Sequence, residues 1–392
     1  MKQKKILIII ILLLLLVSSA TNLFASQNER EVLRLLFTGG PQEVEYTTQF
    51  QKAVPLSSMT QITDQIFAQI GALLTVEGEA NPYTIIFEKG HATFYIALDP
   101  EGKIAGLQIT EIIPEGTTLE DAVAQIIDMK GTTSVLVRKN GKTLYEHNPH
   151  LPLAVGSAFK LAILAALDDA IEQGRLDWEQ IVVLDPKWKS LPTGILQDWP
   201  NGSRVTIETL ATLMISMSDN TATDALIDLV GREEIGTYIP STLVTLSTGE
   251  LFRLKNPDNK HILETYRNAS TIKRKNILDT IGKFDLPDSN IFSGNPIAID
   301  IEWYMSTTQL ANLIERLEHL DLLTVNPGLA NVERWQRVAY KGGSEPGVLN
   351  LTTFLIDTEG NRYSVSVTVN DSDSPLPEND IISAYQTILH TL

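Results

Sequence analysis

The stretch Gly156-Ser157-Ala158-Phe159-Lys160, followed by an apolar run that ends at Leu167, decides how the rest of the chain is interpreted. The run is apolar on every face, which is typical of a helix buried inside a domain. Ser157 is expected where that helix begins, because serine is a favoured residue at helix N-termini. Ser157 and Lys160 are three residues apart, so their side chains share one helix face, and we expect them within hydrogen-bonding range.

Two interpretations of this pair stay open at this point. In one, Ser157 caps a helix whose first turn contains a lysine, and such four-residue patterns recur by accident. In the other, Ser157 is an activated nucleophile: Lys160 accepts its proton if burial lowers the lysine pKa, and the helix dipole favours developing negative charge.

Composition excludes several classes of function. The chain has 392 residues and 43% apolar residues, which is enough for two domains with large cores. A net charge of −17 argues against nucleic acid as a partner. There is no cysteine, and the one close pair among six histidines, His147 and His150, is separated by Pro149 and predicts a loop. We therefore expect neither a metal nor a cofactor.

Residues 1–25 have the pattern of a signal peptide. Lys2, Lys4 and Lys5 precede a short apolar run, and small residues at Ser18-Ser19-Ala20 offer a cleavage site, with Ala25 as a second one. The run is short for a membrane-spanning helix, which needs about 20 apolar residues. We expect export with cleavage rather than a retained anchor, hence an extracytoplasmic protein without stable membrane insertion.

Residues 28–115 predict a small α+β domain. Two amphipathic helices, 28–36 and one opening at Ser57, precede three strand-like runs, 83–88, 93–98 and 104–112, joined by glycine turns. We expect an antiparallel meander with a packing or substrate-shaping role rather than a ligand site. Residues 114–118 read as a linker.

Residues 117–392 predict a second α+β domain. Strands at 134–138 and 143–146 flank Asn140-Gly141, a strong hairpin signal, and three more strands are expected at 338–341, 348–356 and 363–369. Helices occupy the region between, and a closing helix spans 380–392. Strands at both ends predict one antiparallel sheet built from both termini and covered by helices, because the alternation of a parallel sheet is missing.

Three motifs stand in order in this second domain: Ser157-x-x-Lys160, Ser218-Asp219-Asn220 and Lys341-Gly342-Gly343-Ser344. Each is weak alone, but together they form a recognisable set. The chain resembles the class A β-lactamase and penicillin-binding-protein superfamily of serine hydrolases. Gly342 stands where that family usually has threonine or serine, whose hydroxyl helps to hold a substrate carboxylate.

The resemblance implies catalytic roles for four residues. Ser157 would attack a carbonyl and become acylated, and Lys160 would accept or relay its proton. Ser218 would pass a proton to the leaving group, helped by the ammonium group of Lys341.

The resemblance also implies substrate-binding roles for Asn220, Gly343 and Ser344. Asn220 can donate to and accept from a substrate amide. Gly343 lets the strand approach closely, and the backbone N–H groups of Ser157 and Ser344 would form the oxyanion hole. Asp219 is expected to hold its loop rather than to touch substrate.

One family segment is missing. The chain has no Glu-x-x-Leu-Asn segment, whose glutamate activates the water that frees the acyl group in class A β-lactamases. Glu250 could substitute, but a surface salt bridge is the favoured interpretation. The chain is therefore most similar to the serine hydrolases of the clavulanate-cluster type, which carry an upstream domain like those of nuclear transport factors and steroid isomerases. The matching stretches are 50–73, 194–200, 214–224, 301–304 and 341–347.

The sequence thus predicts an exported serine hydrolase that acts through a covalent acyl-enzyme on a small ester or β-lactam-like substrate, with weak β-lactam turnover. A D-Ala-D-Ala peptidase acting on cell-wall peptide and a β-lactamase proper are enzymatic alternatives. A non-catalytic ligand- or cell-wall-binding protein is the third alternative, from a class other than enzymes.

Overall fold

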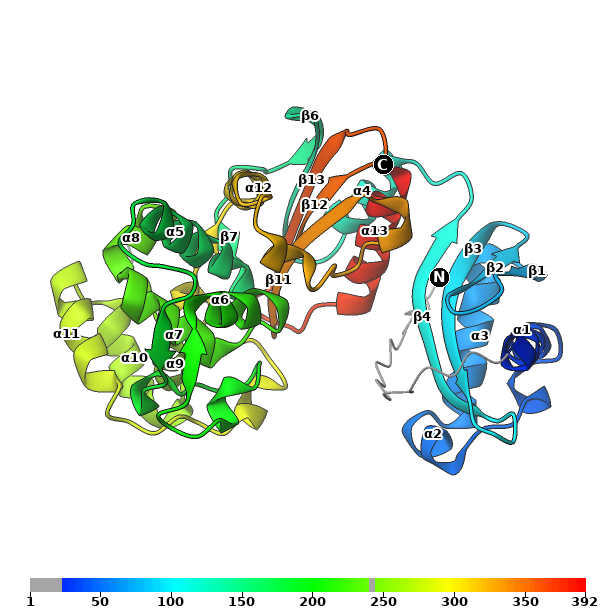
Figure 1. Ribbon diagram of the computed structural model, residues 1–392, viewed down its shortest axis with the longest axis horizontal. Coiled ribbons are helices and arrows are strands. Elements are labelled where there is room, and N and C mark those ends of the chain that lie inside the picture. The colour runs from blue at the N-terminus through cyan, green and yellow to red at the C-terminus, as the bar shows by residue number, and fades with distance from the viewer. Residues whose placement is uncertain (1–22, 240–243) are drawn as a thin grey trace. The chain divides into compact units, whose positions relative to one another are not determined.

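The computed structural model describes residues 23–239 and 244–392, so most of the predicted signal segment lies outside the described residues. The chain forms two compact units (Figure 1). One extends to residue 126 and includes residues 377–392, and the other comprises residues 127–376. Across the described ranges, no helix combines the length and apolarity that crossing a membrane requires.

The first unit contains a four-stranded antiparallel sheet in sequence order. Its strands are β1 (Leu73–Glu77), β2 (Tyr83–Phe87), β3 (Gly90–Leu98) and β4 (Ile104–Pro114). The predicted meander is confirmed, and β1 adds a strand that the sequence did not indicate. The helices are α1 (Leu23–Thr38), α2 (Thr48–Ala53), α3 (Leu56–Ile70), α4 (Leu119–Ile127) and α13 (Glu378–Thr391).

The core of the first unit forms between α3 and the sheet. Ile62, Ile66 and Ile70 recur at helical spacing and are buried. They belong to one cluster with alternating sheet residues such as Ile85 and Phe94. The amphipathic pattern of α3 therefore determines which face of the meander is covered.

The second unit contains a five-stranded antiparallel sheet in the order β11-β12-β13-β5-β6. The strands are β5 (Thr132–Lys139), β6 (Lys142–His147), β11 (Arg337–Glu345), β12 (Val348–Ile356) and β13 (Arg362–Asn370). Asn140 and Gly141 turn the β5–β6 hairpin with φ of 50° and 75°. The expected sheet built from distant parts of the chain is confirmed, and β11 is its edge strand.

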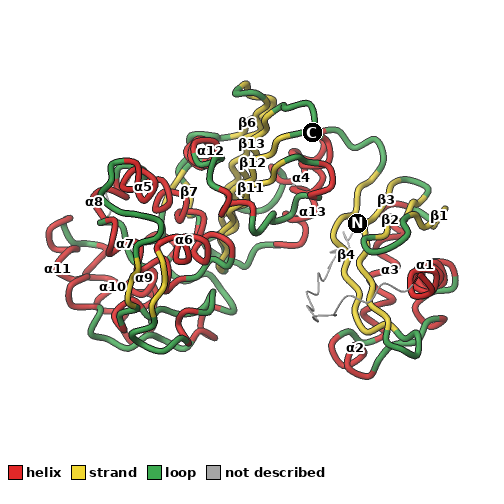
Figure 2. Tube along the Cα trace, viewed as in Figure 1, coloured by secondary structure: helices red, strands yellow, loops and turns green. Residues whose placement is uncertain are grey.

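The other elements of the second unit are mainly helices, which gather beside the sheet (Figure 2). They are α5 (Lys160–Glu172), α6 (Ile207–Ser216), α7 (Asn220–Val230), α8 (Arg232–Gly236), α9 (Thr248–Lys255), α10 (Lys260–Arg267), α11 (Thr271–Ile281) and α12 (Thr307–Arg316). Two short ribbons pair β7 (Leu153–Ala154) with β10 (Tyr304–Met305) and β8 (Ile181–Val183) with β9 (Arg204–Thr206).

Helix α5 is the centre of the second unit. From Leu161 to Leu167 every side chain is buried, as a helix without a polar face predicts. The predicted α+β class holds for both units. The domain boundary expected at residues 116–117 stays a prediction, because α4 and α13 group by packing with the first unit.

Candidate active site

Ser157 lies in a 3-10 turn, Gly156–Phe159, which precedes α5. Neither this turn nor α5 has a side-chain capping hydrogen bond, so Ser157 is not the N-cap of the helix. The turn is held by Phe159, whose ring stacks on Trp303 with centroids 3.7 Å apart, and by the Val155 N–H, which donates to the Trp303 carbonyl. The capping interpretation is therefore wrong, and the Ser157 hydroxyl is not used by the helix.

Lys160 is the first residue of α5 and is fully buried. Its Nζ donates to the Ser218 carbonyl at 2.7 Å and to Asn220 Oδ1 at 2.8 Å, and it lies 3.1 Å from Ser218 Oγ. Burial, followed by the nearby charge of Lys341, lowers the pKa of Lys160 well below its usual value. A neutral amine could donate two of these bonds and accept the third, so it is a chemically competent base.

The second motif connects α6 to α7. Ser218 has φ of 55°, a conformation that is uncommon for a residue with a side chain and that often marks functional sites. Asp219 is fully buried and caps α7 by accepting from the Ala222 N–H. Its other oxygen accepts from the N–H groups of Ile195 and Leu196 at 2.7 and 2.9 Å. Asp219 thus holds the loop, as expected.

The third motif lies within β11, because the strand continues through the glycines. Lys341 is almost fully buried, and its Nζ donates to the Gly342 carbonyl at 2.6 Å and lies 3.2 Å from Ser218 Oγ. Burial lowers the pKa of Lys341 to about 7. Two lysines from distant parts of the sequence therefore contact one hydroxyl, that of Ser218.

Gly343 brings β11 against the turn Gly156–Phe159, which we call the nucleophile turn after the role expected of Ser157. A Cβ at this position would lie 2.2 Å from the Val155 carbonyl oxygen and 2.4 Å from the Ser157 nitrogen. A Cβ at Gly156 would lie 3.2 Å from the Ser344 nitrogen. The backbone nitrogens of Ser157 and Ser344 therefore both lie where β11 meets this turn. Because β11 is an edge strand, the backbone N–H and C=O groups on its outer side are not paired within the sheet.

One expected contact is not formed. Among the described residues, the Ser157 hydroxyl makes no hydrogen bond, so the expected Ser157–Lys160 bond is absent from this structure. The reason is that the Ser218 carbonyl and Asn220 Oδ1 are better acceptors for the Lys160 amine and lie within its reach. Ser157 also lies in the 3-10 turn rather than in α5, which changes the direction of its side chain relative to Lys160.

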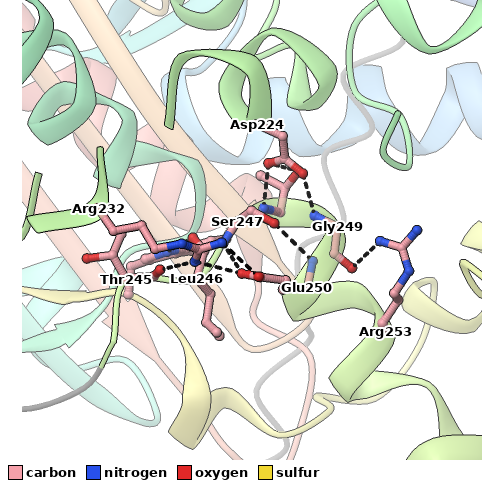
Figure 3. Close-up of polar contacts among 10 residues, drawn as sticks. Asp224, Arg232, Thr245, Leu246, Ser247, Gly249, Glu250 and Arg253 are labelled. Carbon is pink, nitrogen blue, oxygen red and sulfur yellow. Dashed lines mark hydrogen bonds and ion pairs between the residues drawn. The ribbon is translucent and has the colours of Figure 1, made fainter. Parts of the chain in front are cut away.

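Glu250, the suggested substitute for the missing base, is bound elsewhere (Figure 3). Its carboxylate accepts from both terminal nitrogens of Arg232 at 2.8 and 2.7 Å. It also accepts from the Ser247 N–H in a capping box at the start of α9. The predicted salt bridge is thus confirmed, although it is largely buried rather than on the surface.

Two residues near the site were missed by sequence reasoning. A Cβ at Gly342 would lie 2.2 Å from the Tyr340 phenol oxygen, so Tyr340 puts a hydroxyl beside the position where the family usually has one. Burial raises the pKa of Tyr340 to about 12, which keeps it a neutral donor. Asp224, one turn along α7, accepts from Thr248 and Gly249 (Figure 3), and burial raises its pKa to about 6. Neither residue stands in a spacing that indicates a role.

Part of the chain is similar to known proteins. Residues 118–277 match the family model described as Beta-lactamase enzyme family. The curated β-lactamase VEB-1 of Pseudomonas aeruginosa is 25% identical over 167 residues, which are 38% of this chain and 56% of that protein. The match thus spans little more than half of that relative's length.

Similar solved structures include a β-lactamase of Sphaerobacter thermophilus DSM 20745, with 22% identity and a TM-score of 0.49 over 70% of this chain and 94% of that one. A PBP-A mutant in an acyl-enzyme complex with penicillin G has 16% identity and a TM-score of 0.49, with the same coverages. The family model and the curated relative thus show that residues 118–277 are similar to β-lactamases.

Proposed function

We propose that this protein is an exported serine hydrolase that forms a covalent acyl-enzyme on Ser157. One observation carries the proposal: the buried amines of Lys160 and Lys341 both contact Ser218 Oγ, while Gly343 sets the edge strand against the backbone of Ser157. The match of residues 118–277 to the β-lactamase family model supports it.

In the proposed acylation step, Ser157 Oγ attacks the substrate carbonyl and the bond to the leaving oxygen or nitrogen breaks. The hydroxyl proton passes to the Lys160 amine. Ser218 delivers a proton to the leaving group and is resupplied by Lys341. Catalytic hydrogen bonds often tighten only in the substrate complex, and substrate binding must bring the Lys160 amine and the Ser157 hydroxyl into contact.

The proposed substrate class rests on the state of the two carboxylates that could activate a water molecule, Glu250 and Asp224. Glu250 is held by Arg232, and Asp224 accepts three hydrogen bonds from the start of α9. Because both carboxylates already accept hydrogen bonds from these groups, we propose an esterase-like enzyme on which a β-lactam forms an acyl-enzyme that is hydrolysed slowly. In a Glu250→Gln variant, the rate of acyl-enzyme decay should equal that of the wild type.

Mass spectrometry of the intact protein tests acylation. After incubation with an activated ester or a β-lactam, we expect a mass increase that maps to Ser157 and is abolished by Ser157→Ala. Ser203→Ala, at a half-buried serine of the same unit whose hydroxyl donates to the Pro200 carbonyl, is the matched control and should keep the adduct. No adduct with either probe would refute the proposal.

The main alternative is a D-Ala-D-Ala peptidase. The Lys341 amine and the Tyr340 hydroxyl, which lie around Gly342, would suit the terminal carboxylate of a peptide. Release of D-Ala from a cell-wall peptide would favour this activity, and rapid β-lactam turnover would favour a β-lactamase proper. Tight ligand binding that survives Ser157→Ala, without turnover of any ester, would indicate a non-catalytic binding protein.

Export rests on residues 1–25, whose charged start, apolar run and small residues fit a signal peptide. Determining the N-terminal residue of the protein recovered from an expressing bacterium tests export. Cleavage near Ala20 or Ala25 supports export, and an uncut chain in the cytoplasm contradicts it.

A further inference from the structure

The first unit brings together two histidines and a glutamate from three elements. His91 lies on β3, Glu111 on β4 and His390 in the last turn of α13. In the register of β3 and β4, Thr93 pairs with Glu111 and His91 with Ile113, so His91 and Glu111 are diagonal neighbours on one sheet face. One side-chain ligand atom from each of the three residues lies within 4.8 Å of the others.

The surroundings of Glu111 favour a cation. Its side chain is only 12% exposed, and its Oε1 lies 3.6 Å from His390 Nδ1, which is beyond hydrogen-bonding distance. The rings of His91 and His390 have centroids 4.9 Å apart. A nearly buried carboxylate that faces two imidazoles is costly unless a positive charge compensates it.

We propose that His91, Glu111 and His390 bind one divalent zinc ion. Two imidazole nitrogens and one carboxylate oxygen are a ligand set that zinc uses in proteins, with bonds of about 2.0–2.2 Å. Ligand atoms around such an ion are roughly 3.3–3.5 Å apart, so the three side chains need to approach by about an ångström, which rotations about their side-chain bonds can supply.

Two of the three proposed ligands line a cavity. A cavity of about 540 Å³ lies against this cluster, and His91 and His390 line it together with Phe87 and Ile113. Three protein ligands and an open position next to a cavity are the arrangement in which zinc keeps a water molecule or an exchangeable ligand. The bound ion would also fix the end of α13 to the sheet, where Gln386 already donates to the Thr110 carbonyl.

The site is independent of the Ser157 chemistry, since all three ligands belong to the first unit. The sequence did not indicate this zinc site, because its three ligands are far apart in the chain. Among the histidines only His147 and His150 stand close together. Residue spacing reveals metal sites only when the ligands are local.

Isothermal titration of the chelator-treated mature protein with zinc chloride tests the proposal. We expect one saturable site, accompanied by a rise in Tm, because an ion that binds only the folded chain stabilises it. Binding should release protons, because zinc binds only deprotonated ligands.

His91→Gln, Glu111→Gln and His390→Gln should each weaken zinc binding by at least about tenfold, since even losing a residue that only orients a ligand costs 10–100-fold. His150→Gln is the matched control and should bind like the wild type, as should Ser157→Ala. Circular dichroism verifies that each variant folds, and anomalous scattering at the zinc edge locates the ion. Absence of saturable binding to the wild type, or unchanged binding by folded His91→Gln and His390→Gln variants, would overturn the proposal.

Discussion

Replacing Gly343 with alanine tests whether the approach of β11 to the nucleophile turn is needed for acylation. The new Cβ would lie 2.2 Å from the Val155 oxygen, 2.4 Å from the Ser157 nitrogen and 2.6 Å from the Ala158 nitrogen. All three are backbone atoms, so no side chain can move aside to make room. The strand must shift away from the turn, and the nitrogens of Ser157 and Ser344 must separate.

The size of the effect follows from two contributions. Inserting a methyl group into a packed contact costs about 1–3 kcal/mol, and each kcal/mol lowers Tm by about 2–4 °C in a chain of this size. We therefore expect Tm to fall by about 2–12 °C. Misplacing one oxyanion donor costs about 10²–10³-fold in rate, so acylation of Ser157 should slow by that factor.

The assay is the time course of adduct formation at Ser157 by mass spectrometry, at a temperature where the variant remains folded. Gly236→Ala is the matched control, because a Cβ there meets no atom within 4 Å and φ is ordinary. It should acylate at the wild-type rate. If Gly343→Ala acylates as fast as Gly236→Ala and melts at the same temperature, the close approach of β11 does not build the site.

Three further predictions concern the polar groups of the site. The pKa of Lys341 is about 7 in the folded protein and about 10.4 in the unfolded chain. Between these pH values the unfolded chain binds more protons, so the free energy of unfolding should rise with pH from about 7 to about 10. Urea unfolding across that range should show a smaller rise for Lys341→Met. Tyr340→Phe should raise KM for a carboxylated substrate by about 10–100-fold, the worth of a hydrogen bond to a charged group, and leave an uncharged ester unaffected; equal changes for both substrates would argue against this role. Asp219→Ala leaves the N–H groups of Ile195, Leu196 and Ala222 without their acceptor, so urea unfolding should show a loss of about 3–5 kcal/mol, and a loss below about 1 kcal/mol would mean that the loop is held by other contacts.

Local patterns predicted the elements that determine the fold. The apolar helix after Ser157, the Asn140-Gly141 turn and the capping of α6 by Thr206 all depend on interactions within a few residues, and each is found as expected. The five-stranded sheet also followed from sequence, because apolar alternation at both ends of the second domain left few other ways to bury the strands. Strand β1 (Leu73–Glu77) was missed, since it is short, most of its residues are exposed and its apolar and polar residues do not alternate strictly.

Contacts between distant residues could not be predicted. The three motifs indicated that Lys160, Ser218 and Lys341 share a site, but not that Lys160 bonds to Ser218 and Asn220 instead of Ser157. That choice depends on which acceptors lie within reach of a buried amine, and this is decided by tertiary packing. The position of the Tyr340 phenol beside Gly342 is also decided by tertiary packing, so the sequence did not predict it.

The state of Lys160 connects these observations to the reaction. Its amine is buried and satisfied by groups of the second motif, and Ser157 is held in a turn where its hydroxyl has no partner within residues 23–239 and 244–392. An enzyme in this state has a base and a nucleophile in the same region but not yet in contact. A substrate that donates a hydrogen bond to Asn220 Oδ1 would compete with Lys160 for this acceptor. It would thereby release the Lys160–Asn220 hydrogen bond and let the amine turn to Ser157. Acylation would then depend on groups of the substrate that engage Asn220, so simple esters without such groups should acylate Ser157 more slowly than amide-bearing substrates of equal reactivity.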